Sequence, residues 1–389
     1  MQRKKTPFLY LGALAAFSLL VFDLYQPALP AITRYFNTSH ALGQLTLSLF
    51  FFIFGISQLV WGPFIDHYGR NKILRYSLYL FLLATIICML APNIETLIAG
   101  RALQGFAVCC SNVVAFSCSR DEEDSTDRAR LLSHIAMIVS VSPIFAPLIG
   151  SVIFVYLGWR TTFLFMALGG GLLLLFSRYC LCESPFWRDS PDRLTFKKLL
   201  WAYKGLLTHK RLWITIAIIT ASYSCVMIVV VNIAYLMIDN LGISPTLFSI
   251  FFASNGLIMI LGNWIGIKIR KHRNLPWNIR FGSRVMVSGS LLTVVLFYLN
   301  GLSLVSLAPL LLINLGVTLT NPPTLSLALS DYQHQASTAI ALFNTVRMSL
   351  SAIIAGIVGS LVVFDEKLFA FSLLFCSIVC MLFSLVCKE

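Results

Sequence analysis

Long apolar runs recur along the whole chain, and they limit what it can fold into. Twelve runs have roughly 18 or more residues, the length at which a helix crosses a bilayer. They are centred near residues 20, 53, 82, 108, 143, 170, 225, 257, 292, 315, 350 and 376. Lipid offers no hydrogen-bond partner to an open backbone, and the short alternating segments of a membrane β-barrel are absent. We therefore predict an all-α polytopic membrane protein with twelve transmembrane helices.

The basic residues indicate the orientation of these helices. The chain has 29 Lys and Arg residues against 16 Asp and Glu, a net charge of +13. With the N-terminus inside, 24 of the basic residues fall in inner segments, and only Arg34, Arg160 and Lys367 fall in outer loops. This asymmetry predicts that both termini are cytoplasmic. Membrane topology thus accounts for the positive charge, and no nucleic-acid partner is expected.

Other residue types agree with a membrane protein that is not an enzyme. None of the ten cysteines falls in an outer loop, so no disulfide framework is predicted. Cys180 and Cys182 have no second cluster beside them, so we expect them to pack in the core and expect no metal site. No cofactor is expected, and no nucleophile–base pair or phosphate loop indicates catalysis. Tryptophans near predicted helix ends are expected to be interfacial anchors: Trp61, Trp159, Trp213 and Trp264.

The longest basic stretch, from about Arg178 to Arg211, lies between the sixth and seventh runs. The segment IFAPLIGSVI (144–153) in the fifth span resembles IIAGIVGSLV (353–362) in the eleventh, which is the fifth span of the second half. Transporters are often built from such repeats. We predict an N-terminal six-helix bundle (1–182), a basic cytoplasmic central loop (183–212) and a pseudo-symmetric C-terminal six-helix bundle (213–389).

Three strong charges remain within the predicted spans: Asp23, Arg101 and Arg347. A charge at a helix centre costs roughly 2.5–3.5 kcal/mol on insertion scales, so each requires a partner or water. At 1.5 Å per residue, Asp23 and Arg101 lie roughly 14 and 8 Å below the outer face, within reach of each other in height. We predict that they pair, and that Asp23 binds a proton when the helices part. The alternative is a fixed structural ion pair.

Polar side chains extend from the two arginines along helix faces. Asn112 lies on the same face as Arg101, although asparagine in a membrane helix can also join helices by hydrogen bonds. Asn344 shares a face with Arg347, for which the alternative is snorkelling to the inner surface. A polar site between the halves is predicted to contact solute through these residues: Tyr25, Asn112, Asn232, Asn321, Asn344 and Arg347.

These segments resemble a known family. DLYQPALPAI (23–32) is similar to the first-span signature, roughly Asp-Met-Tyr-Leu-Pro-Ala-Leu-Pro, of the bicyclomycin/chloramphenicol-resistance branch of the major facilitator superfamily. GPFIDHYGRNK (62–72) resembles the superfamily's loop between spans two and three, and RALQG (101–105) its span-four motif. SPIFAPLIGS (142–151) resembles the span-five antiporter motif. The resemblance implies a drug:H+ antiporter in a bacterial inner membrane.

The same motifs carry the predicted gating residues. Gly62 and Gly69 would allow tight turning and close helix approach. Asp66 is placed to meet a helix N-terminus, where an anion is favoured by roughly 0.3–1 kcal/mol. The resemblance implies that this loop locks one conformation, and that the bend at Pro143 and Pro147 seals the cavity against leak. The full predicted set is Gly62, Asp66, Gly69, Arg70, Pro143, Pro147 and Gly150.

The sequence therefore predicts a monomeric, proton-coupled exporter of a small organic solute that works by alternating access. Asp23 would carry the proton and Arg101 would tune it. The resemblance implies a drug-like cargo. However, Arg101 and Arg347 together outweigh Asp23, which favours anionic or zwitterionic cargo such as a siderophore or metabolite. The open alternatives are a proton-coupled uptake symporter and a membrane receptor without transport. The expected partners are the solute, protons and the lipid bilayer.

Overall fold

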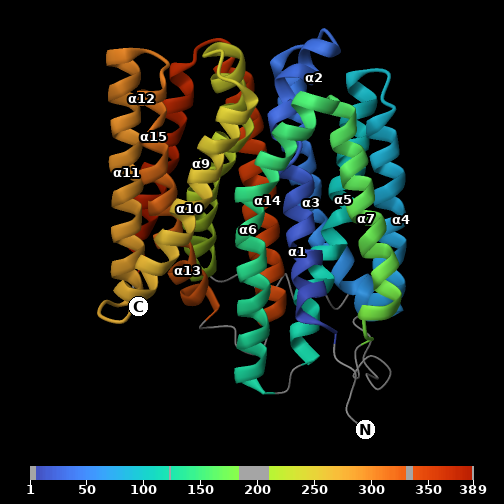
Figure 1. Ribbon diagram of the computed structural model, residues 1–389. Coiled ribbons are helices and arrows are strands. Elements are labelled where there is room, and N and C mark those ends of the chain that lie inside the picture. The colour runs from blue at the N-terminus through green and yellow to red at the C-terminus, as the bar shows by residue number, and fades with distance from the viewer. Residues whose placement is uncertain (1–5, 122–123, 184–209, 330–335, 388–389) are drawn as a thin grey trace.

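The computed structural model describes residues 6–121, 124–183, 210–329 and 336–387. Within these ranges all the regular structure is helical (Figure 1). The first half contains α1 (Phe8–Asp23), η1 (Gln26–Ala28), α2 (Leu29–Tyr35), α3 (His40–Tyr68), α4 (Arg70–Met89), α5 (Ile94–Ser117), η2 (Cys118–Asp121), α6 (Ser125–Leu157) and α7 (Trp159–Cys180). The second half contains α9 (Lys210–Ala234), the π-helix η3 (Tyr235–Asn240), α10 (Pro245–Arg270), α11 (Leu275–Asn300), α12 (Leu304–Leu307), α13 (Leu310–Leu329), α14 (Ala336–Val362) and α15 (Lys367–Val386).

The predicted fold class is confirmed. Among the described residues, 12 helical segments are long and apolar enough to cross a membrane, and each predicted centre falls inside one of them. Nine of the spans lie within single helices, whereas the first combines α1, η1 and α2, the seventh combines α9 and η3, and the tenth combines α12 and α13. The apolar run length was sufficient to find every span, because a chain in lipid must satisfy its backbone within a helix.

The first span is broken in the middle by its prolines. Pro27 and Pro30 have no backbone N–H, so neither can donate the helical hydrogen bond to the residue four positions earlier. The chain passes from α1 into the short 3-10 helix η1 at this point and then continues as α2. Helix α6 crosses the break closely, since a Cβ built on Gly150 would lie 2.3 Å from the Leu24 backbone oxygen. Gly150 is therefore required here for close helix approach.

The helices of the two halves pack against each other through two pairs. Helix α3 of the first half lies along α14 of the second, and α6 lies along α10 (Figure 1). Of the predicted central loop (183–212), residues 184–209 lie outside the described part of the chain. The predicted domain boundaries therefore stay a prediction.

Both chain termini lie at one end of the bundle, which we call the terminal end (Figure 1). The opposite end, which carries α2 and α12, is called the far end. Near the helix ends, Trp213 and Trp264 are exposed as expected for interfacial anchors. The prediction is wrong for Trp61 and Trp159, each only 7% exposed. Trp61 donates a hydrogen bond from Nε1 to the Phe106 carbonyl over 2.7 Å. Its indole joins α3 to α5 instead of facing a headgroup region.

Candidate functional site

Asp23 lies at the break in the first span and is nearly enclosed. It ends α1, and only 6% of its surface is exposed. Gln26, the first residue of η1, donates from Nε2 to Asp23 Oδ1 over 3.0 Å and is itself fully buried. No other hydrogen bond reaches the Asp23 side chain from the described residues. The acid that the sequence singled out therefore has an amide as its partner.

Arg101 lies in α5 with no exposed surface, held by aromatic rings. Its guanidinium carbon is 4.5 Å from the Tyr25 ring centroid and 4.3 Å from that of Phe50. A desolvated cation–π contact contributes about 2 kcal/mol. Arg101 Nη1 also donates to Gln104 Oε1 over 2.9 Å, and Gln104 Nε2 donates to Thr85 Oγ1 over 2.8 Å. Within the described chain, Nε and Nη2 of Arg101 have no hydrogen-bond partner.

The predicted ion pair between Asp23 and Arg101 does not form in this conformation. No Arg101 nitrogen is within ion-pair or hydrogen-bond distance of the Asp23 carboxylate, which accepts from Gln26 instead. The physical reason is the aromatic ring two residues after Asp23. Tyr25 lies over the guanidinium, and its hydroxyl is fixed by a 3.0 Å hydrogen bond with Thr46 Oγ1.

Arg347 of α14 has fewer contacts with described residues than Arg101 has. Its guanidinium carbon lies 4.5 Å from the ring centroid of Tyr223 in α9, and the residue is half-buried. None of its donors has a hydrogen bond to a described residue, and its Nε is buried without a partner. The sequence reasoning missed Tyr223, since the predicted site takes only Asn232 from the seventh span.

The predicted asparagines do not form one continuous polar stripe. Asn112 donates to Ser18 Oγ over 3.3 Å and so joins α5 to α1. This agrees with the alternative prediction that Asn112 joins two helices by a hydrogen bond. Asn321 of α13 accepts from Ser222 of α9 through its side-chain oxygen. Asn344 is half-buried in α14, one turn from Arg347. Of these three amides, Asn344 is the one without a hydrogen bond to another described helix.

Asn232 belongs to a different set of contacts, at the far end, where the two halves are joined. It is fully buried, accepts from Gln44 Nε2 over 2.9 Å and donates to the Ile228 carbonyl over 2.8 Å. Nearby, the Thr33 and Tyr235 hydroxyls are 2.6 Å apart. In this conformation Asn232 therefore holds the halves together and is not available to a solute.

An ion pair completes the far-end contact. Arg34 Nη1 of α2 lies 3.0 Å from Asp239 Oδ1 of η3, and His40 Nε2 of α3 lies 3.6 Å from Asp239 Oδ2. The His40 ring stacks on the Tyr235 ring at 4.5 Å between centroids. The sequence reasoning missed this cluster. Its signal was an arginine among the three basic residues of the outer loops, together with an acid at the end of the seventh span.

The loop between α3 and α4 has a capping carboxylate that was not predicted. Gly69 has φ 87°, a left-handed conformation that glycine adopts readily, as expected for the tight turn. Glu183 accepts from the backbone N–H groups of Arg70 (2.8 Å) and Asn71 (3.2 Å) and so caps the N-terminus of α4. Arg70 in turn makes a two-pronged hydrogen bond with Asp121, at 2.6 and 3.1 Å.

The remaining predicted gating residues differ in their surroundings. The prediction for Gly62 is wrong in one respect, since a Cβ built there would meet nothing within 4 Å and no close approach requires glycine. Asp66 is exposed in the last turn of α3, and its gating role stays a prediction. Pro143 and Pro147 lie inside α6, and the Pro147 carbonyl accepts from Ser249 of α10 over 2.9 Å. The proline segment thus contacts the other half directly.

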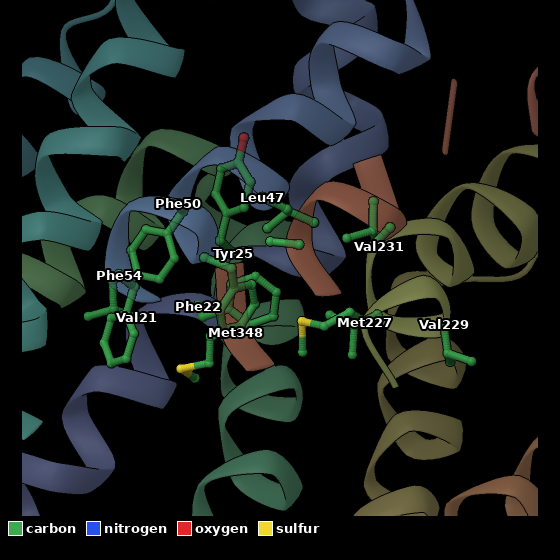
Figure 2. Close-up of a cluster of buried hydrophobic side chains, with 14 of the residues drawn as sticks. Val21, Phe22, Tyr25, Leu47, Phe50, Phe54, Met227, Val229, Val231 and Met348 are labelled. Carbon is green, nitrogen blue, oxygen red and sulfur yellow. The ribbon is translucent and has the colours of Figure 1, made fainter. Parts of the chain in front are cut away.

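Apolar side chains from both halves surround the charged residues. Figure 2 shows Phe22 and Phe54 of the first half with Met227 and Met348 of the second, and all four belong to one buried cluster. The Phe22 and Phe51 rings lie 4.0 Å apart between centroids. Methionine side chains are flexible and polarisable, so they adapt to apolar partners of different shape. The centre of the molecule therefore combines apolar surface with two arginines and one acid.

Comparison with known proteins assigns the family. A family model described as Major Facilitator Superfamily matches residues 11–356. The chain belongs to the Major Facilitator Superfamily. Its relatives include the "Uncharacterized MFS-type transporter YdgK" of Bacillus subtilis (strain 168), 30% identical over 359 residues that cover 90% of this chain and 87% of that one.

Relatives with drug-resistance names agree with the branch that the motifs resembled. The "Chloramphenicol resistance protein" of Pseudomonas aeruginosa is 26% identical over 368 residues, covering 90% of this chain and 82% of the relative. "Multidrug resistance protein MdtL" of Escherichia coli O139:H28 is 33% identical over 173 residues, covering 43% of this chain and 44% of MdtL. The MdtL match is therefore to less than half of each protein.

Solved structures support the superfamily fold. The "D-xylose-proton symporter" crystal structure has a TM-score of 0.73 at 14% sequence identity, with 96% of each chain covered. A bacterial homolog of the human lysosomal transporter Spinster, in an inward-facing and unoccupied conformation, has a TM-score of 0.72 at 14% identity and covers 97% of this chain and 94% of that one. The family and the fold are those of membrane transporters of small solutes rather than of enzymes.

Proposed function

We propose that this major facilitator protein is a proton-coupled exporter of small organic solutes that works by alternating access. The observation that carries the proposal is Asp23, a nearly enclosed carboxylate at the break of the first span. An acid in this place changes its surroundings when the halves move. Intramembrane acids of this kind serve as proton carriers in pumps and transporters.

The orientation of the chain assigns each end of the molecule to one side of the membrane in the proposed cycle. The positive-inside rule puts the terminal end in the cytoplasm and the far end in the periplasm of a bacterial inner membrane. The contacts of Arg34 and His40 with Asp239 then close the periplasmic side. In the cycle, solute binds from the cytoplasm in this conformation, the far end opens, solute leaves, and a proton on Asp23 accompanies the return.

The charges of the site favour anionic or zwitterionic cargo. Arg101 and Arg347 have no carboxylate partner among the described residues, and Asp23 neutralises at most one of them. Excess positive charge in a site of low dielectric attracts anions. A drug-like compound that carries a carboxylate, a siderophore or an acidic metabolite all meet this requirement. Arg347 would bind the acidic group, and the apolar cluster around Phe22 and Met348 would contact the rest.

A transport assay with three probes of different charge tests the proposal. Proteoliposomes are loaded with chloramphenicol (neutral), nalidixate (anionic) or ethidium (cationic), and a pH step is applied across the membrane. An exporter of this kind moves nalidixate against an opposing proton flux, and moves ethidium slowly or not at all. Gradient-driven transport that is unchanged in Asp23→Asn would refute the role of Asp23.

Proton-coupled uptake is the second candidate, because a D-xylose-proton symporter shares the fold. The same pH step separates the two functions. In an exchanger the proton and solute fluxes oppose each other, whereas in a symporter they run together.

A further inference from the structure

We propose that Gln26 is a positioning residue that links closure of the far end to the charge of Asp23. The inference rests on the proposed function, because it concerns the proton on that acid. In the conformation with a closed far end, Gln26 donates to the Asp23 carboxylate and stabilises its ionised form. When the far end opens, the Gln26 amide rotates so that its NH₂ group no longer donates to the carboxylate, and Asp23 takes up a proton from the periplasmic side.

The first observation is the hydrogen bond itself. Gln26 Nε2 lies 3.0 Å from Asp23 Oδ1, with both residues buried. A hydrogen bond donated to a carboxylate favours its charged form. Where the quoted first-span signature has leucine, this chain has glutamine, so the donor is a departure from that signature.

The second observation is that the other charged or titratable groups facing Asp23 are not bound to it. Arg101 of α5 is held between two aromatic rings and by Gln104. Tyr223 of α9 lies under the Arg347 guanidinium, and no hydrogen bond joins it to Asp23 among the described residues. Gln26 is therefore the described residue that hydrogen-bonds to Asp23 in this conformation.

The third observation connects Gln26 to the other half of the molecule. The 3-10 helix η1, which begins at Gln26, is contacted by α6 and by α10. Helix α10 belongs to the second half, and its Ser249 donates to the Pro147 carbonyl of α6 over 2.9 Å. Because Pro27 and Pro30 interrupt the helix, η1 can shift without moving all of α1. Movement of α10 away from η1 thus changes the place of the Gln26 amide.

The chemistry of a primary amide suits both charge states of the acid. The Gln26 NH₂ group donates to the ionised carboxylate, while its Oε1 is buried and has no hydrogen-bond partner among described residues. A protonated Asp23 carboxyl can itself donate a hydrogen bond. After the Gln26 amide rotates, its Oε1 accepts that hydrogen bond. The proton enters from the periplasmic water and leaves to the cytoplasm, so no other reactant is required.

Infrared difference spectroscopy of the protein in lipid tests the inference. The carbonyl band of protonated Asp23 is isolated by subtracting the Asp23→Asn spectrum at each pH. Gln26→Met keeps the side-chain length but removes the donor, so this band should persist to a pH about one unit higher, a tenfold change in proton affinity. A midpoint that stays where it is in the wild type would overturn the inference.

Two further variants separate the possible outcomes. Gln58→Met removes a partly buried amide hydrogen bond, from Gln58 Nε2 of α3 to the Met348 sulfur of α14, and should leave the midpoint of the Asp23 titration in place. Gln26→Asn keeps the amide but shortens its reach, so it should behave like Gln26→Met. If Gln26→Asn titrates like the wild type, general polarity and not positioning governs Asp23. If no Asp23 band appears at any pH, the acid takes no proton, which refutes the proposed function together with this inference.

A double-mutant cycle tests the link to the far end. Asp239→Asn weakens the contact with Arg34. It should shift the midpoint of the Asp23 titration when Gln26 is present, but should leave that midpoint unchanged in the Gln26→Met background. Equal shifts in both backgrounds would show that closure acts on Asp23 by a route other than Gln26.

Discussion

Each half of the molecule carries one arginine within the membrane, and the two are held differently. Arg101 has an aromatic ring at 4.5 Å and another at 4.3 Å, and an amide oxygen at 2.9 Å. Arg347 has a single ring at 4.5 Å, that of Tyr223, and no hydrogen bond to a described residue. The difference teaches that buried charges of the same kind can serve different purposes. In the proposed function, the fully enclosed arginine adds to the field of the site, whereas the half-buried one, here called the open arginine, binds the solute.

The largest effect is expected when the open arginine loses its charge. Arg347→Gln should weaken nalidixate binding by about 10- to 100-fold, since a hydrogen bond to a charged group contributes roughly 1.5–3 kcal/mol. Binding of neutral chloramphenicol should change less than about threefold. Equilibrium binding in detergent measures both, with Arg347→Lys as the control that keeps the charge. Equal losses of affinity for the two probes would mean that Arg347 maintains the structure and does not bind the charged group of the cargo.

The enclosed arginine should affect stability more than cargo binding. Arg101→Lys keeps the charge, but a compact ammonium cannot stack between Tyr25 and Phe50 as a planar guanidinium does. We expect a loss of about 1–2 kcal/mol and a Tm lower by a few degrees in thermal unfolding. The nalidixate affinity should stay within about threefold of the wild type. A loss as large as that of Arg347→Gln would remove the distinction between the two arginines.

The smallest effect is expected at the ring below the open arginine. Tyr223→Leu removes the cation–π contact and should weaken nalidixate binding by about two- to fivefold, because such contacts contribute about 0.5–1 kcal/mol at partly exposed sites. Tyr223→Phe keeps the ring and should bind like the wild type in the same titration. If Tyr223→Phe binds as weakly as Tyr223→Leu, the hydroxyl and not the ring orients Arg347.

Local features of the fold could be predicted from the sequence because local physics decides them. Each span required only a long apolar run. The turn at Gly69, which has φ 87°, was likewise a local prediction. Prolines were a weaker guide, because the first span changes to a 3-10 helix at Pro27, whereas Pro143 and Pro147 lie inside the continuous helix α6. Gly62 shows the limit of this reasoning. The sequence identifies a glycine in a recognised loop, but only packing reveals that no neighbour lies within 4 Å.

The site was harder to predict, because its contacts join residues distant in the sequence. Depth in the membrane made Arg101 a possible partner for Asp23, but depth alone could not reveal that the Tyr25 ring covers the guanidinium. Glu183 caps a helix that begins 113 residues earlier, at Arg70. The Thr33–Tyr235 contact at the far end spans 202 residues. Such contacts depend on how twelve helices pack, which an apolar pattern does not specify.

The most direct test of the account is solute-induced proton release in weakly buffered detergent solution. Binding of a solute that competes with the proton must release that proton, because linkage between the two ligands is reciprocal. We expect nalidixate to release up to about half a proton per wild-type protein at the midpoint of the Asp23 titration, where half of the carboxyls are protonated, and none from Asp23→Asn. Equal release from both proteins, or release from neither while nalidixate binds, would contradict coupling through Asp23.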